Sequence, residues 1–289
     1  MKRLALILIV LTTGCARFAV NRIGDAMAGS GSTFASDNDP ELIRDAAPFA
    51  LKLEESLLAE SPRHRGLLLA TASGFTQYGY AFVQQEADEL ETRDVAGAKT
   101  MRDRARKLYV RARDYGLRGL RVNELGFEKA VRLATKRDVP LLFWTAASWG
   151  ALISISKNDP DVVADLPKVE ALIDRALVLD EKFERGAIHS FLINYEMARP
   201  GLSPAEREKR AKQHFDRAME LGAGKVASPL VSYAEAVCLQ RQQRAEFERL
   251  LKEALAIDVD QMPDCRLANL VTQRRARWLL SKIDDLFVE

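Results

Sequence analysis

An eight-residue pattern that occurs three times in the second half of the chain constrains its fold most strongly. The three copies span residues 173–180, 215–222 and 251–258, and they read IDRALVLD, FDRAMELG and LKEALAID. Each copy begins with an apolar residue, carries alanine at the fourth place and an aliphatic residue at the seventh, and ends on Asp or Gly. Such spacing places the apolar side chains on one face of a helix, so each copy predicts an amphipathic helix that ends close to the pattern's last residue.

The spacing of the copies predicts an α-solenoid. Their central alanines, Ala176, Ala218 and Ala254, are 42 and 36 residues apart. A tetratricopeptide (TPR) helix pair repeats about every 34 residues, and its second helix needs a small residue where two helices touch. Loop insertions would account for the extra length, and weaker copies occur at residues 109–116 and 54–62. We therefore expect TPR-like repeats, the alternative being a chance likeness among alanine-rich helices.

The rest of the chain also predicts helices, and no segment shows the alternation of a half-buried strand. The fold class is therefore all-α. One helix should begin at Asp39-Pro40, which supply a cap and a first-turn proline. Another should end at Gly116. The expected helices span residues 40–60, a long segment from about 64, and then 96–115, 160–179, 184–198, 203–221, 226–241, 244–257 and 265–281.

The N-terminus predicts a secreted, lipid-anchored protein. Residues 1–14 have a basic start and an apolar run over 4–11, as in a signal peptide. Thr12, Thr13 and Gly14 precede Cys15 and resemble a bacterial lipobox, although Thr12 stands where an aliphatic residue is usual. The run is too short to span a bilayer, so a lipidated Cys15 would anchor the chain without threading it. The alternative is an ordinary signal that is cleaved elsewhere.

Sorting, domain limits and charge follow from this assignment. Ala16 lacks the acidic character of an inner-membrane retention signal, which favours the outer membrane with the body in the periplasm. We expect a signal peptide over 1–14, a lipidated lead-in over 15–38 and one TPR-like domain over 39–289. Residues 1–14 hold two of the 43 basic residues and none of the 41 acidic residues, so the mature chain is neutral. A neutral chain does not indicate nucleic-acid binding or a polybasic membrane surface.

Signals of enzymatic chemistry are poor. The sequence contains neither a glycine-rich phosphate loop nor a Gly-x-Ser-x-Gly elbow, and no histidine has a triad setting. We expect no catalytic residue and no cofactor. Neighbouring carboxylates are interpreted as helix caps and surface charge; they are Glu54 with Glu55, Asp159 with Asp161, and Asp284 with Asp285.

The histidines and the remaining cysteines are expected to be structural. His64, His189 and His214 are far apart in the sequence, and none has a neighbour at metal-ligand spacing. Cys238 and Cys265 could pair in an oxidising periplasm. In parallel repeat helices, however, their sulfur atoms would lie at different heights. The sequence therefore favours two separate, mostly buried thiols and no metal site.

Residues 141–156 form a sixteen-residue stretch without charge, LLFWTAASWGALISIS, in a chain that is 29% charged. A helix that is apolar all round is either core or lines an apolar space. We expect this helix to line a cavity with Trp144 or Trp149 exposed to a ligand, the alternative being a central core helix. The two tryptophans are five residues apart, so they cannot both lie at the centre of one narrow face. Tyr78 and Tyr80 are weaker candidates for the same cavity.

Seven segments follow one another along the chain in a recognisable order. They are SDNDPELIRDA at 36–46, PFALK at 48–52, HRGLLLA at 64–70, YGLR at 115–118, FWT at 143–145 with Trp149, LPKVEAL at 166–172 and HFDRA at 214–218. Together, after a lipobox, they resemble the TatT family, the TPR-containing lipoproteins associated with TRAP (tripartite ATP-independent periplasmic) transporters. The likeness runs from about residue 17 to residue 287. At residues 199–204 the chain has RPGLSP where the family often has a turn with Gly-Gly-Lys.

The resemblance implies a TPR-like protomer with an apolar cleft or pore, assembled as a homotrimer. It implies a periplasmic substrate-binding protein as partner for each protomer, and transfer between them of a small ligand that could be hydrophobic. Two other functions remain open at this point. One is a TPR lipoprotein that scaffolds envelope assembly by holding a peptide in its groove, and the other is an enzyme of an unrecognised kind.

Overall fold

The computed structural model of the chain describes residues 21–29 and 31–287, and these residues form helices and turns without any strand. The expected all-α fold is confirmed. A helical segment over 21–29 comes first. The elements of the first half are α2 (Gly31–Ala35), α3 (Pro40–Glu60), α4 (Arg65–Gly79), the π-helical turn η1 (Tyr80–Gln84), α5 (Gln85–Leu90), α6 (Val95–Gly119), α7 (Val122–Leu125), α8 (Phe127–Leu133), η2 (Lys136–Asp138) and α9 (Val139–Ser154).

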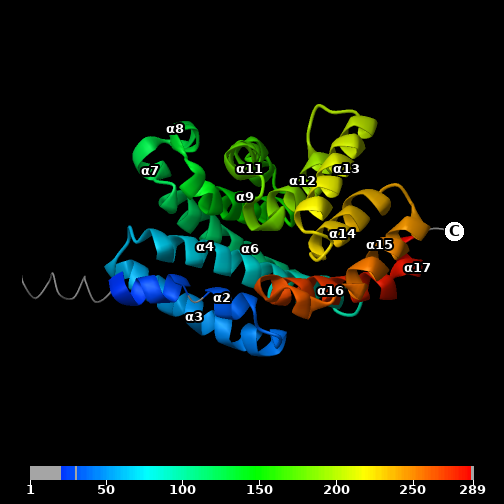
Figure 1. Cartoon of the computed structure of the whole chain (residues 1–289), viewed down its shortest axis with the longest axis horizontal. Coiled ribbons are helices and arrows are strands. Elements are labelled where there is room, and N and C mark those ends of the chain that lie inside the picture. Colours follow the sequence, from blue (N-terminus) through cyan, green and yellow to red (C-terminus); the bar gives the residue numbers. More distant parts are fainter. Residues whose placement is uncertain (1–20, 30, 288–289) are drawn as a thin grey trace, which may run out of the picture.

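The second half continues the succession of packed helices, as the colours of Figure 1 show. None of the helices in the described part of the chain is long and apolar enough to cross a bilayer. The elements are α10 (Pro160–Val163), α11 (Leu166–Asp180), η3 (Phe183–Arg185), α12 (Ala187–Ala198), α13 (Pro204–Leu221), α14 (Ser228–Tyr233), the π-helical turn η4 (Ala234–Cys238), α15 (Arg244–Ala256), η5 (Val259–Gln261), η6 (Pro263–Cys265), α16 (Arg266–Ser281) and α17 (Ile283–Leu286).

Local sequence explains several helix boundaries. The Asp39 carboxylate accepts hydrogen bonds from the backbone N–H groups of Glu41 and Leu42, each at 3.0 Å, which confirms the predicted start of α3. The helix expected over 160–179 is instead divided into α10 and α11. Pro167 lies in the first turn of α11, where its missing N–H costs no helical hydrogen bond. The helix expected over 184–198 begins only at Ala187, because the three residues before it have left-handed backbones.

The alanines of the recurring pattern lie at helix contacts. Ala112, Ala176, Ala218 and Ala254 are each no more than 1% exposed. Ala59, in the weak first copy, is exposed and has no such role. The recurring pattern therefore marks packed positions in four of its five copies, as a helical-repeat fold requires.

Gly116 does not end a helix, so that prediction is wrong. Helix α6 continues through it to Gly119. A Cβ atom at Gly116 would overlap the hydroxyl group of Thr145 on α9. The glycine is needed because the backbones of α6 and α9 approach closely at this point.

Helix α16 joins the two ends of the described chain. One of its faces buries Ala276 and Leu279 in the C-terminal core. Another face packs Leu267 and Val271 against the N-terminal core. The Arg266 guanidinium donates to the Ser36 carbonyl at 2.7 Å, more than two hundred residues away in the sequence. The helical succession therefore closes on itself, and α16 lies beside α2 and α3 in Figure 1.

Candidate functional site

Helix α9, which contains most of the uncharged stretch, is core over most of its circumference. Ten of its sixteen residues are buried. The partly exposed residues share one stripe, because they are spaced three or four apart. This stripe consists of Pro140, Trp144, Ala147, Gly150 and Ala151, with the exposed Ser154 at its end. Only this narrow side of α9 is available to a ligand, and Trp144 is its largest side chain.

Trp149 and Tyr78 belong to the core. Trp149 is 4% exposed and lies edge-on to Phe127, with ring centroids 6.2 Å apart. The guanidinium of Arg113 lies 5.2 Å from the centre of its ring. Tyr78 is 8% exposed and its hydroxyl accepts a hydrogen bond from Arg104 at 3.2 Å. The structure therefore does not bring all four aromatic candidates to one place, and Trp144 and Tyr80 are the accessible ones.

Trp144 lies in an aromatic cluster that joins α9 to η3. Its ring meets Phe143 edge-on at 5.0 Å between centroids, and Phe143 lies 5.3 Å from Phe183. The Trp144 side chain lies beside the Glu184 carboxyl group and lowers its pKa. A carboxyl group is thereby held against an otherwise apolar group of rings.

Glu184 has an exposed side chain, yet burial by neighbouring protein raises the pKa of its carboxyl group to about 7, and Trp144 opposes this increase. Its backbone is left-handed, with φ 41° and ψ 49°. Arg185 and Gly186 follow at φ 57° and 94°. Left-handed backbone at non-glycine residues is costly, and it persists where the surroundings impose it.

Tyr80 shows the same combination of an exposed side chain and a raised pKa. Its side chain is 41% exposed, yet burial, and secondarily the Glu235 carboxylate, raises the pKa of its hydroxyl to about 12. Arg275 of α16 also interacts with Tyr80. Just before the other end of α16, Cys265 lies near Arg185 and Glu184. Helix α16 therefore connects the surroundings of Glu184 to those of Tyr80 over ten residues, which is about 15 Å of helix.

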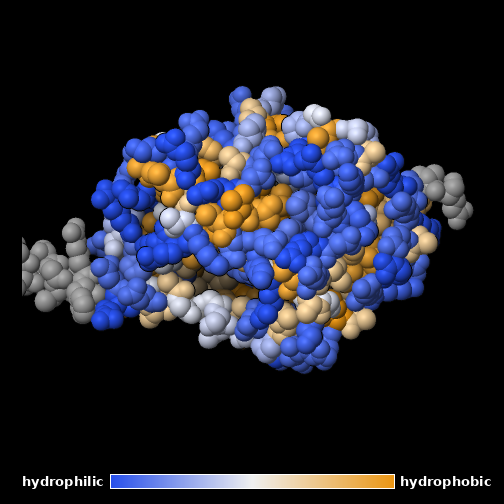
Figure 2. Space-filling view, turned by 45° about the horizontal axis from the view of Figure 1, so that its top comes forward, coloured by the Kyte–Doolittle hydropathy of each residue, from blue (hydrophilic) through white to orange (hydrophobic). Residues whose placement is uncertain are grey.

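We call this region the central recess and define it by the partly exposed side chains of Tyr80, Trp144 and Glu184 together with Leu267 and Val271 of α16. Figure 2 shows hydrophobic residues gathered in the middle of one face and in a hollow below it, with hydrophilic residues around them. Glu184 was not expected from the sequence. Its neighbours in space come from α9 and η6, and only the Phe-Glu-Arg-Gly turn could have drawn attention to it.

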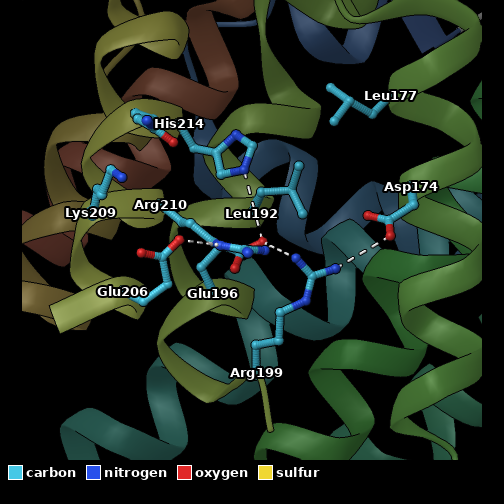
Figure 3. Close-up of a pocket in the computed structure, with 10 residues that line it drawn as sticks. Asp174, Leu177, Leu192, Glu196, Arg199, Glu206, Lys209, Arg210 and His214 are labelled. Atoms are coloured by element: carbon cyan, nitrogen blue, oxygen red, sulfur yellow. Dashed lines mark hydrogen bonds and ion pairs between the residues drawn. The ribbon is translucent and has the colours of Figure 1, made fainter. Parts of the chain in front are cut away.

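A second concave site is charged and lies between α11, α12 and α13 (Figure 3). It has a volume of about 370 Å³ and is lined by Asp174, Leu177, Leu192, Glu196, Arg199, Glu206, Lys209, Arg210, Gln213 and His214. Arg199 lies at its centre, with hydrogen bonds to Glu170 at 3.0 Å, Glu196 at 2.6 Å and Asp174 at 3.3 Å. We call this site the charged groove. Most of its charges are already paired, so it suits a polar surface better than an apolar ligand.

His189 and His214 meet behind the charged groove, although they are 25 residues apart in sequence. Their Nδ1 atoms are 2.9 Å apart, so one nitrogen donates and the other must be an unprotonated acceptor. Burial, and then the neighbouring His189, lowers the pKa of His214 to about 4. Sequence spacing gave no sign of this pair. His64 instead caps α4 by accepting from the Leu67 N–H at 3.2 Å. The described part of the chain contains no group of three or more side chains placed to hold a metal ion.

Glu54 corrects the expectation that the neighbouring carboxylates are all caps or surface charges. It is only 7% exposed, and burial raises its pKa to about 7, against a smaller opposing effect of the Thr71 hydroxyl. Asp159 does cap a helix, accepting from the Val162 N–H at 3.4 Å. Cys238 is buried and Cys265 half-buried, and both are free thiols, as expected. Cys15 lies outside the described residues.

Comparison with known proteins identifies the family. The chain is 28% identical over 268 residues to an uncharacterized protein of Treponema pallidum (strain Nichols). The aligned region covers 89% of this chain and 83% of the Treponema protein. Residues 36–287 match the family described as the TRAP transporter T-component. This match takes in every helix from α3 to α17, and the family is one of transporter components and not of enzymes. The chain therefore belongs to the TRAP transporter T-component family.

Proposed function

We propose that this T-component binds a small apolar ligand in the central recess and docks the periplasmic substrate-binding protein of its transporter. The observation that carries the ligand proposal is the open stripe of α9, where Trp144 is left partly exposed within an aromatic cluster. Ligand sites are typically concave and mostly apolar, with few polar groups that fix orientation. The recess has this composition, with Tyr80 and Glu184 as its polar members.

The location and assembly of the protein are parts of the same proposal. We infer that residues 1–14 direct export, that lipidated Cys15 anchors the chain to the outer membrane, and that three protomers assemble. Several acyl chains hold a protein stably at a membrane, whereas one chain binds only marginally. Replacing Cys15 by Ala should therefore move the protein from the membrane fraction to the periplasmic extract. A Cys15→Ala variant that stays in membranes after a high-salt wash would contradict the anchor.

Ligand binding is tested with a fluorescent apolar probe, N-phenyl-1-naphthylamine, on the full mature chain. We expect saturable binding by the parent and weaker binding by Trp144→Ala, whose melting temperature should change little because Trp144 is only partly buried. Val178→Ala is the matched control, since Val178 is 77% exposed on α11. If Trp144→Ala and Val178→Ala both bind like the parent, the ligand site is not in the recess.

Docking and stoichiometry are tested together by native mass spectrometry. The protein, gently purified, is measured alone and after addition of the substrate-binding protein of its own transporter. We expect a trimer that gains up to three copies of the partner. A protein that remains monomeric and gains no partner would contradict this assembly.

The charged groove favours a second candidate function, a scaffold that holds a polar peptide. The observation is that Lys209, Arg210 and Glu206 surround a concave site whose buried Glu196 keeps one oxygen without a hydrogen-bond partner. A Lys209→Glu change should then abolish capture of envelope proteins other than the substrate-binding protein. We infer no catalytic role for either site.

A further inference from the structure

The geometry points to a receptor for a positively charged amine at one end of the central recess, formed by Glu184 with Trp144. This inference rests on the proposed function, because the apolar recess would hold the remainder of such a ligand. The ligand class is an apolar molecule that carries an ammonium group.

The carboxyl group of Glu184 has no cation of its own. None of the ion pairs in the described part of the chain includes Glu184, although Arg185 is its neighbour in sequence. Arg185 is instead paired with Asp264 at 3.3 Å. The neighbouring Trp144 indole, which has a single N–H, could occupy only part of the acceptor capacity of the carboxylate. The remaining lone pairs can accept from a ligand.

The rings beside Glu184 suit a cation as well. Trp144, Phe143 and Phe183 form a continuous cluster, with centroid distances of 5.0 and 5.3 Å. The faces of aromatic rings attract ammonium groups, and tryptophan does so most strongly. A carboxylate next to such rings attracts a cation and repels an anionic ligand. The cluster therefore selects the sign of the charge on a ligand.

The backbone holds the carboxyl group in this position at a cost. Glu184 and Arg185 are consecutive non-glycine residues with φ of 41° and 57°. Phe183 is fixed on one side by Phe143, and Arg185 on the other by Asp264. If Glu184 had a helical backbone conformation, its side chain would point in another direction. Strained backbone of this kind gathers at binding sites, where it positions a functional group in advance.

The experiment measures binding of three probes with the same ten-carbon chain by isothermal titration calorimetry at pH 8 and low salt. They are decyltrimethylammonium, decanol and decanoate, all kept below their micelle concentrations. We expect the parent to bind the cation at least about tenfold more tightly than decanol, since desolvated cation–π contacts and the carboxylate both act on it. Decanoate should bind more weakly than decanol.

Glu184→Gln preserves size and backbone preference but removes the charge, so this variant should bind the cation and decanol with similar affinities. Glu60→Gln makes the same chemical change at an exposed site and should keep the preference for the cation. A parent that binds decanol but shows no preference, or a Glu184→Gln variant that retains it, overturns the amine receptor alone. A parent that binds neither decanol nor the cation overturns both proposals. Cation binding that depends on Glu184 without decanol binding supports the receptor and removes the general apolar site.

The pH dependence gives an independent reading, because the quaternary probe keeps its charge at every pH. The pKa of Glu184 is raised to about 7, so cation affinity should increase severalfold from pH 6 to pH 8 as the carboxyl group ionises. The other charged or titratable groups that face it are Arg185, Asp264 and Cys265, and burial raises the pKa of the Cys265 thiol, which stays neutral in this range. An affinity that is constant or falls over this interval overturns the receptor.

Discussion

Arg274 of α16 donates two hydrogen bonds to Glu89 of α5, at 3.0 and 2.9 Å, across 185 residues of sequence. The two side chains are 34% and 24% exposed, so the pair lies at the boundary between solvent and the protein interior. Together with Leu267 and Val271, this pair holds the last long helix against the first part of the chain.

A double-mutant cycle of Arg274→Ala and Glu89→Ala should give a coupling free energy of about 1 kcal/mol, because two-point guanidinium–carboxylate contacts exceed ordinary surface pairs. The measurement is urea unfolding of the four proteins at 0.15 M salt. Lys212 and Asp216, which form an exposed pair within one helix, serve as the control and should couple by less. Equal coupling in both cycles would show that the pair does not help to hold α16 in place.

Gly116→Ala should destabilise the protein by about 1–3 kcal/mol, since the new methyl group would force α6 and α9 apart at Thr145. Unfolding by urea measures the change. Gly31→Ala is the control, because no atom lies within 4 Å of the position its Cβ would take. A Gly116→Ala variant as stable as Gly31→Ala would mean that the two helices can separate without cost.

Glu54 should make the protein less stable as the pH rises through neutrality. Its pKa in the folded protein is raised from 4.5 to about 7, so its contribution is fully present below 4.5 and is lost as the pH rises through 7. Glu54→Gln should remove this dependence and stabilise the protein at pH 8 by about 1–2 kcal/mol. Thermal and urea unfolding between pH 4.5 and 8 would show it. Glu60→Gln, at the exposed end of the same helix, should leave the profile of the parent unchanged.

His214 should make the protein less stable as the pH falls, which is the opposite of the pH dependence expected for Glu54. Its pKa in the folded protein is lowered from 6.5 to about 4, so the stability it contributes is present above 6.5 and is lost as the pH falls through 4. His214→Phe should lower stability at pH 7 by about 1 kcal/mol, because His189 loses its partner. The same variant should lose less stability than the parent between pH 7 and pH 5. Gln213→Ala, one residue away and exposed, should keep the acid sensitivity of the parent.

The features that could be predicted from sequence are those set by nearby residues. Asp39 and Pro40 predict the start of α3, because a capping carboxylate and a first-turn proline act within a few residues. The recurrence of Ala176, Ala218 and Ala254 at the same place of the pattern predicts close helix contacts. The absence of charge in α9 predicted that this helix is buried. Which of its residues are core and which form the open stripe depends on the helices that pack against it.

The features that could not be predicted depend on distant residues. His189 and His214 meet because α12 and α13 pack together, and no spacing in the sequence reports the register of that contact. Gly116 has the usual character of a helix end, yet a close approach of α9 determines its role. Glu184 belongs to a short turn between helices, and its surroundings come from α9, η6 and the strained backbone itself. The roles of these residues can be recognised only when the tertiary structure is known.

The position of α16 also has a consequence for the order in which the protein can mature. Helix α16 begins at Arg266, and its residues Leu267 and Val271 complete the N-terminal core, more than seventy residues after the last buried member of that core, Tyr195. While the chain is being synthesised from its N-terminus, the first core therefore keeps one apolar side uncovered until α16 has been made. A chain cut short before α16 would retain most of its helices but would lack the wall that closes the recess. The proposed binding of a ligand in the recess would therefore require α16 to be in place.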